Sequence, residues 1–199
     1  MLSKFKCVLA AATLLVASTG ANAGAVSTIG NVSESGGVYT ITTGTGSVSD
    51  SALETFGGFY AGALDAEMGT DVTEGSAIKS TIEVEAGDTL SFDWVWDTDD
   101  YLPFNDFAFV GLSLLGIEEV LASVAISGDY GTTSGSYSWT AGAAGVLTYV
   151  IGVVDVGDTA VTSYLNVSKL SPVPVPAAAL LFGSALLGFA GFSARRKVS

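Results

Sequence analysis

The chain has 199 residues, with twenty acidic and seven basic side chains, no histidine and a single cysteine, Cys7. The absence of histidine excludes Ser-His-Asp and Cys-His catalytic arrangements and disfavours a catalytic zinc site. All the acidic residues but only two basic ones, Lys79 and Lys169, lie between residues 24 and 171, so this region carries a net charge of about −18 and repels nucleic acid and anionic lipid.

The first residues have the pattern of a secretory signal peptide. A positive start is followed by an apolar core too short to span a bilayer and by an A-x-A cleavage site. These features are Lys4 and Lys6, Val8 to Val16, and Ala21 and Ala23. We expect residues 1–23 to direct export through the Sec machinery and to be removed. Because Cys7 precedes the apolar core, the mature chain then has no thiol.

Residues 24–170 are expected to form one acidic all-β domain, a β-sandwich or jelly roll of about eight strands. The clearest strand is Leu90 to Trp96, in which Leu90, Phe92, Trp94 and Trp96 alternate with smaller or polar residues. The expected strands are 38–41, 77–84, 90–96, 107–115, 120–126, 136–140, 146–156 and 160–170. A short helix or irregular segment is expected within 53–67, and a loop over 127–135. The Ser/Thr-rich start, 27–51, favours strand edges over a flexible stalk.

Acidic residues gather in two expected loops of this domain. If the loops meet at one end of the sandwich, their oxygens have the chemistry that Ca²⁺ prefers. The candidate ligands are Asp99, Asp100, Asn105, Asp106, Asp155 and Asp158. The other interpretation is that these residues are solvated turn formers, because Asp and Asn favour turns.

A glycosidase is a second hypothesis, because two carboxylates are sufficient for that chemistry. Asp93 and Asp97 flank Trp94 and Trp96, whose faces are of the kind that stacks on sugars. Aromatic residues at strand period are more often core, however, and this interpretation ranks lower.

The carboxyl-terminal residues predict a membrane anchor. Residues 171–176 form a stiff, proline-rich linker. Residues 177–194 are uncharged and almost all apolar, long enough for a transmembrane helix, and 195–199 form a basic tail in which Arg195, Arg196 and Lys197 follow the apolar run directly. Since positive charge marks the cytoplasmic side, the tail is expected inside and the β domain outside the inner membrane.

The order of these features resembles the PEP-CTERM sorting signal, in its VPxPA variant. The motif residues are Val173, Pro174, Val175, Pro176 and Ala177, followed by the apolar helix and the basic cluster. Val175 stands where the founding motif has Glu. The resemblance implies an exosortase-like processing enzyme as partner, in a Gram-negative bacterium that makes exopolysaccharide. The phrases at 86–94, 104–109 and 152–159 are similar to jelly-roll domains often found ahead of such tails.

Together these observations predict an exported, non-enzymatic protein of the cell surface, extracellular matrix or biofilm, with a structural or glycan-binding domain. The tail would hold it in the inner membrane until processing releases or transfers it. A carbohydrate-active enzyme on the same anchor, and an unprocessed single-span periplasmic protein, are the alternatives. Calcium is the candidate cofactor, and polysaccharide or matrix the candidate ligand.

Overall fold

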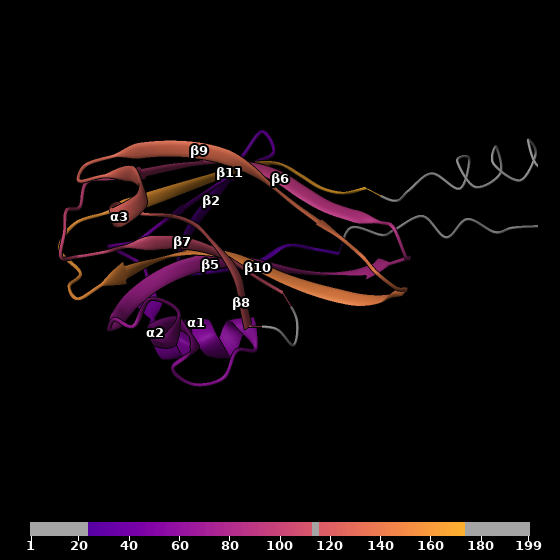
Figure 1. Cartoon of the computed structure of the whole chain (residues 1–199), viewed down its shortest axis with the longest axis horizontal. Coiled ribbons are helices and arrows are strands. Elements are labelled where there is room, and N and C mark those ends of the chain that lie inside the picture. The colour runs from indigo at the N-terminus through magenta and orange to yellow at the C-terminus, as the bar shows by residue number, and fades with distance from the viewer. Residues whose placement is uncertain (1–23, 113–115, 174–199) are drawn as a thin grey trace, which may run out of the picture.

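The computed structural model describes residues 24–112 and 116–173, which form two antiparallel sheets and three short helices. The all-β class is confirmed. The first sheet has the order β1-β5-β10-β7-β8, with β4 also paired to β5, and the second has the order β2-β3-β11-β6-β9. Figure 1 shows the two sheets stacked as layers.

The elements have the following bounds. In the first sheet they are β1 (Ser27–Ile29), β4 (Val48–Ser49), β5 (Val72–Val84), β7 (Phe107–Leu112), β8 (Gly116–Ser123) and β10 (Gly145–Val156). In the second they are β2 (Asn31–Ser35), β3 (Val38–Thr42), β6 (Thr89–Thr98), β9 (Thr132–Thr140) and β11 (Ser163–Val173). The helices are α1 (Asp50–Gly57), α2 (Ala63–Met68) and α3 (Val124–Ser127).

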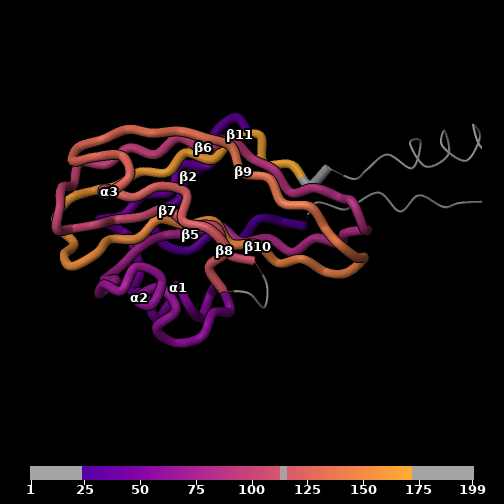
Figure 2. Tube along the Cα trace, viewed as in Figure 1, coloured from indigo at the N-terminus to yellow at the C-terminus, as the bar shows by residue number. Residues whose placement is uncertain are grey.

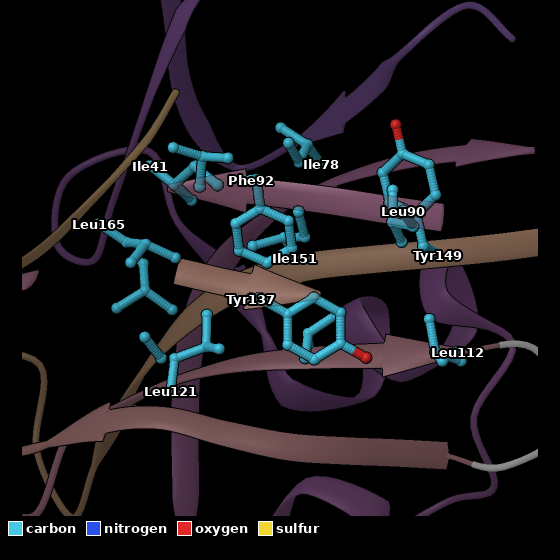
Figure 3. Packing of buried hydrophobic residues seen from close by; sticks show 14 of the residues in the cluster. Ile41, Ile78, Leu90, Phe92, Leu112, Leu121, Tyr137, Tyr149, Ile151 and Leu165 are labelled. Atoms are coloured by element: carbon cyan, nitrogen blue, oxygen red, sulfur yellow. The ribbon is translucent and has the colours of Figure 1, made fainter. Parts of the chain in front are cut away.

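The main core lies between the sheets. Because successive strand residues point to opposite faces, every second side chain of each strand enters this space. Ile151 and Val153 of the first sheet meet Ile41, Phe92 and Leu165 of the second in one buried cluster. Figure 3 shows Ile151 of the first sheet close to Ile41, Phe92 and Leu165 of the second. The rings of Phe92 and Tyr137 stack at a centroid distance of 5.1 Å.

The outer face of the first sheet is also buried, because α1 and α2 cover it (Figure 1). Leu53 and Leu64 of the helices pack there on Phe109, Val150 and Val154. Both faces of β10 are therefore buried along most of its length, and most of its residues are Val, Leu, Ile or Tyr. The expected helical segment within 53–67 is thus confirmed as two short helices, each ending at a left-handed glycine.

Most expected strands are present, and their ends differ. The prediction of a strand through residue 126 was wrong, since β8 ends at Ser123 and 124–127 form α3. Ser123 accepts a hydrogen bond from the backbone N–H of Ile126 and so caps that helix. The expected loop over 127–135 was too long, because β9 begins at Thr132. The Ser/Thr-rich start forms β1 to β4, of which β1 and β2 are edge strands and β3 lies inside the second sheet.

The two ends of the described chain lie at the same end of the domain, away from α3 (Figure 2). Gly24 accepts a hydrogen bond from Ser80, and Val173 pairs with Thr89 at the start of β6. β11 thus continues three residues past the expected end of the domain. The predicted signal peptide, membrane helix and basic tail lie outside the described residues. Among the residues from 24 to 173 that are described, no helix is long and apolar enough to cross a membrane.

Two valines on β10 test the packing of the core. Val153 is 0% exposed between the sheets, whereas Val146 is 67% exposed. We expect Val153→Ala to lower the free energy of unfolding by about 2 kcal/mol, through lost transfer energy and the cavity left behind. The matched variant Val146→Ala should lie within about 0.5 kcal/mol of the wild type. Urea unfolding measures both, and equal losses would contradict this assignment of the core.

Candidate functional site

At the end of the domain near α3, the space between the sheets is closed by polar side chains. On each contributing strand, or one residue past its end, the inward position two residues from a core residue is polar. Thr43 follows Ile41, Thr98 follows Trp96, Asp155 follows Val153, Asp106 precedes Ala108 and Ser163 precedes Leu165. All five are buried. We call Thr43, Thr98, Asp106, Asp155 and Ser163 the polar layer.

Asp106 is held tightly within this layer. It is 0% exposed, and its two carboxylate oxygens accept from the backbone N–H of Val156 at 2.9 Å and from the Ser163 hydroxyl at 2.7 Å. Its backbone carbonyl accepts from the N–H of Val124 at the start of α3. Asp106 therefore joins β10, β11 and α3 at one point. Burial outweighs these hydrogen bonds and raises the pKa of Asp106 to about 6.

Asp155 lies next to Asp106 but has fewer hydrogen-bond partners. It is 1% exposed, and neither of its carboxylate oxygens receives a hydrogen bond from a fixed donor. Burial, followed by the neighbouring Asp106 carboxyl, raises the pKa of Asp155 to about 9, against a lowering contribution from Thr43. Glu74, which pairs with Asp155 from the neighbouring strand β5, also raises the pKa of Asp155. The uncharged form of Asp155 is therefore favoured at neutral pH.

No basic side chain within the described residues neutralises these acids. The basic residues there are Lys79 and Lys169. Lys79 donates to the carbonyl of Phe56 and lies over that ring at 4.4 Å. Lys169 pairs with Asp93 on the exposed face of the second sheet at 2.7 Å. Both cations are thus engaged on other surfaces.

A chain of hydrogen bonds leads from the polar layer outward. The Ser163 hydroxyl contacts the Thr98 hydroxyl at 2.8 Å, and the Thr98 hydroxyl accepts from the N–H of Asp100 at 3.0 Å. The Asp100 carbonyl then accepts from the N–H of Tyr130 at 2.8 Å. Asp100 is 1% exposed, and one of its carboxylate oxygens has no hydrogen-bond partner. Burial raises the pKa of Asp100, and the nearby Asp158 charge adds to the effect.

Above this chain, three aromatic rings from two loops contact one another at the surface. Tyr101 lies 5.7 Å from Phe104, edge to face, and 5.8 Å from Tyr130 between ring centroids. The loops are joined further by Asp129, which accepts from the N–H of Leu102 at 3.0 Å. Tyr130 is 65% exposed. We call Tyr101, Phe104 and Tyr130 the aromatic rim; the composition of these loops had not suggested it.

The structure brings the two predicted acidic loops together, but the acidic residues of these loops make different contacts. Asp106 and Asp155 meet, with Asp100 close by and Asp158 beside Asp100. Asn105 instead accepts from the N–H of Ala125, and Asp99 is exposed. Across the described part of the chain, no group of three or more His, Cys, Asp or Glu side chains is placed to hold a metal ion. The six predicted ligands therefore do not form one coordination shell.

The residues of the glycosidase hypothesis lie elsewhere, in β6. Trp96 is fully buried, and Trp94 is partly buried and packs against the same core, as strand-period aromatic residues usually do. Asp93 and Asp97 are four residues apart on one strand, which separates their backbones by about 13 Å. They are occupied by Lys169 and Thr132 respectively. This spacing is larger than the separation of about 5 to 9.5 Å between paired glycosidase carboxyls.

The sorting residues, from Pro174 to Ala177, and the basic cluster at 195–197 lie outside the described residues, as do Ala21 and Ala23. Only the backbone of Val173 is placed, as the last residue of β11. Comparison with models of known protein families gives no match, and comparison with curated proteins gives none.

Ser163 tests the support of the polar layer. Its hydroxyl donates to Asp106 and contacts Thr98, so Ser163→Ala leaves a buried carboxyl oxygen without its donor. We expect a loss of about 2 kcal/mol in the free energy of unfolding at neutral pH. Ser168, half-exposed on the other face of β11, is the matched control, and Ser168→Ala should have little effect. Thermal unfolding checks both, and an unchanged Ser163→Ala would contradict the role assigned to the hydroxyl.

Proposed function

We propose that this protein is exported, displayed by its carboxyl-terminal tail and sorted by an exosortase-like enzyme, and that it acts as a surface or matrix protein with a glycan-binding β domain. The order of a signal-like start, a proline-containing Val173–Ala177 segment, an apolar run and a basic end supports the export and sorting half. The PEP-CTERM resemblance belongs to this half of the proposal, as does a membrane helix at 177–194.

The strand order supports a jelly roll as the finer description of the fold. Leaving aside the edge strands β1, β2 and β4, the sheets have the orders β5-β10-β7-β8 and β3-β11-β6-β9. In each sheet the earliest strand lies beside the latest, and consecutive strands often belong to opposite sheets. Such returns of the chain are the mark of Greek-key connections, two of which make a jelly roll.

The aromatic rim is the surface that best suits a glycan. The exposed rings of Tyr101 and Tyr130 offer apolar faces with polar tips, which suits the mixed surface of a sugar. Asp129 and Asp99 beside them add hydrogen-bond acceptors for hydroxyl groups. The strongly acidic domain repels anionic polymers, so the ligand class that fits is a neutral or amino-sugar polysaccharide.

The position of the rim relative to the tail is the single observation that carries the display half of the proposal. β11 begins at Ser163, in the polar layer beneath the rim, and ends at Val173, where the tail follows. Its eleven residues span about 30 Å. A tail held in a membrane would therefore leave the aromatic rim on the side of the domain that faces away from it.

Intact mass of the protein from its host tests the sorting proposal. We expect the extracellular form to begin at Gly24 and to end near Pro176, with both terminal segments lost. Pro176→Leu should retain the tail, whereas Pro172→Leu, outside the sorting segment, should be processed normally. An intact tail on the wild-type protein, found only in the inner membrane, would favour the unprocessed single-span alternative.

Two exposed tyrosines test the glycan surface independently of sorting. Tyr130, in the rim, and Tyr60, in the loop between α1 and α2, are 65% and 66% exposed. On cellulose and chitin beads, Tyr130→Ala should reduce retention about tenfold, a loss of about 1.4 kcal/mol. Tyr60→Ala should bind as the wild type does. Equal effects of the two variants, or no binding of the wild type to either polymer, would contradict the assignment.

A further inference from the structure

The contact between Asp106 and Asp155 needs an account of its own, because neither sorting nor glycan binding uses it. Both carboxyls are inside the domain, at 0% and 1% exposure, so no substrate reaches them. Asp106 accepts hydrogen bonds from the N–H of Val156 and from the Ser163 hydroxyl, whereas neither oxygen of Asp155 has a well-formed hydrogen bond, and the nearby Thr43 hydroxyl offsets only part of the effect of burial. A buried carboxylate with so few donors is among the most costly arrangements in a protein interior.

The charged groups around the pair make full ionisation still less favourable. Glu74 faces it from β5, Asp100 from the β6–β7 loop, and Asp158 lies beside Asp100 in the β10–β11 loop. All of them are acidic. β3 and β11 contribute the neutral hydroxyls of Thr43 and Ser163. Since no cation of the described chain is near, the charge has to be removed by a bound proton or by a bound ion.

The geometry favours the proton. The oxygens of Asp106 already accept hydrogen bonds, whereas those of Asp155 do not. When a single proton is added, one carboxyl of the pair can donate a hydrogen bond to the other. Among the described residues, no group of three or more His, Cys, Asp or Glu side chains is placed to hold a metal ion.

We infer that Asp106 and Asp155 share one proton at neutral pH, and that losing it at alkaline pH opens this end of the domain before the rest. The backbone contacts of Asp106 specify what opens: its side chain holds Val156 of β10 and, through Ser163, the start of β11, while its carbonyl holds α3. This inference does not depend on glycan binding.

The direction of the pH effect follows from proton linkage. Both folded carboxyls have a raised pKa, to about 6 for Asp106 and about 9 for Asp155, so the folded state binds more protons than the unfolded state above about pH 4. Their contribution to stability is complete below that pH and is lost as the pH rises through 6 and then 9. The domain should therefore be most stable in mild acid.

Thermal unfolding of the full chain in detergent, from pH 4 to pH 9.5, tests this inference. Asp155→Asn supplies a permanent amide donor to Asp106, so we expect the Tm of this variant to equal that of the wild type near pH 4 and to exceed it by about 5 °C at pH 9. Asp99→Asn removes one exposed charge from the same end and should follow the wild-type curve. Parallel curves for Asp155→Asn and the wild type would overturn the shared proton.

Amide hydrogen exchange of the wild type provides a second measurement, which holds even if Asp155→Asn fails to fold. After correction for the intrinsic pH dependence, protection of the Val156 and Tyr130 amides should fall at least tenfold between pH 6 and pH 9. The Ala141 amide, bonded to Asp88 at the opposite end, should stay protected. Uniform loss at all three sites would overturn the local opening.

If 1 mM Ca²⁺ at pH 8 raised the wild-type Tm but not that of Asp155→Asn, an ion would be the neutralising group and the inference would be wrong.

Discussion

The carboxyl–carboxyl contact between Asp106 and Asp155 is the constraint around which one end of this domain is arranged. Two facing sheets must be closed where the apolar core stops, and here the inward positions of several strands change from apolar to polar within two residues. The Ser163 and Thr98 hydroxyls and the N–H of Val156 are placed by that requirement. If the pair is neutral, these hydrogen bonds close the core; if it is doubly charged, the same burial becomes destabilising.

Hydrogen bonds to the polar layer hold the loops above it in place. Asp100 connects to Thr98 below and to Tyr130 above, so the aromatic rim has a hydrogen-bonded base although its rings are exposed. The opposite end is built differently, with a tight turn at Gly87 and the last residue of β11 beside Thr89. A domain with a preorganised loop end and a tail at the other end suits display, which is why we connect the rim with ligand binding and the tail with attachment.

Much of the fold could be predicted from period and composition alone. The alternation from Leu90 to Trp96 placed four aromatic and aliphatic side chains in the core; Leu90, Phe92 and Trp96 are buried there, and Trp94 is partly buried against them. The boundaries were harder, because tertiary contacts decide them: α3 replaces the end of an apolar run where Ser123 caps it and Asp106 accepts its first N–H. The sequence shows that Val124 is apolar, but it does not show that the Asp106 carbonyl accepts a hydrogen bond from the Val124 N–H.

The candidate site was predictable in outline and not in detail. The calcium hypothesis was conditional on the two acidic loops meeting, and in the structure Asp106 and Asp155 lie together. Which acids point inward depends on strand register and on the bulge between Asp155 and Val156, and the hydroxyls of Thr43, Thr98 and Ser163 carry no sequence signal beyond their two-residue distance from a core position. The aromatic rim arises because two loops cross-link through Asp129, a long-range contact that spacing does not encode.

Carbon-13 NMR of the aspartate side-chain carboxyls, recorded on the labelled full chain in detergent between pH 3 and pH 10, tests the shared proton most directly. The account predicts that two resonances, assigned through Asp106→Asn and Asp155→Asn, still report a protonated pair at pH 5 and lose their proton in coupled steps above it. If every aspartate carboxyl titrated below pH 5, the pair would be fully ionised at neutral pH and the account would be wrong.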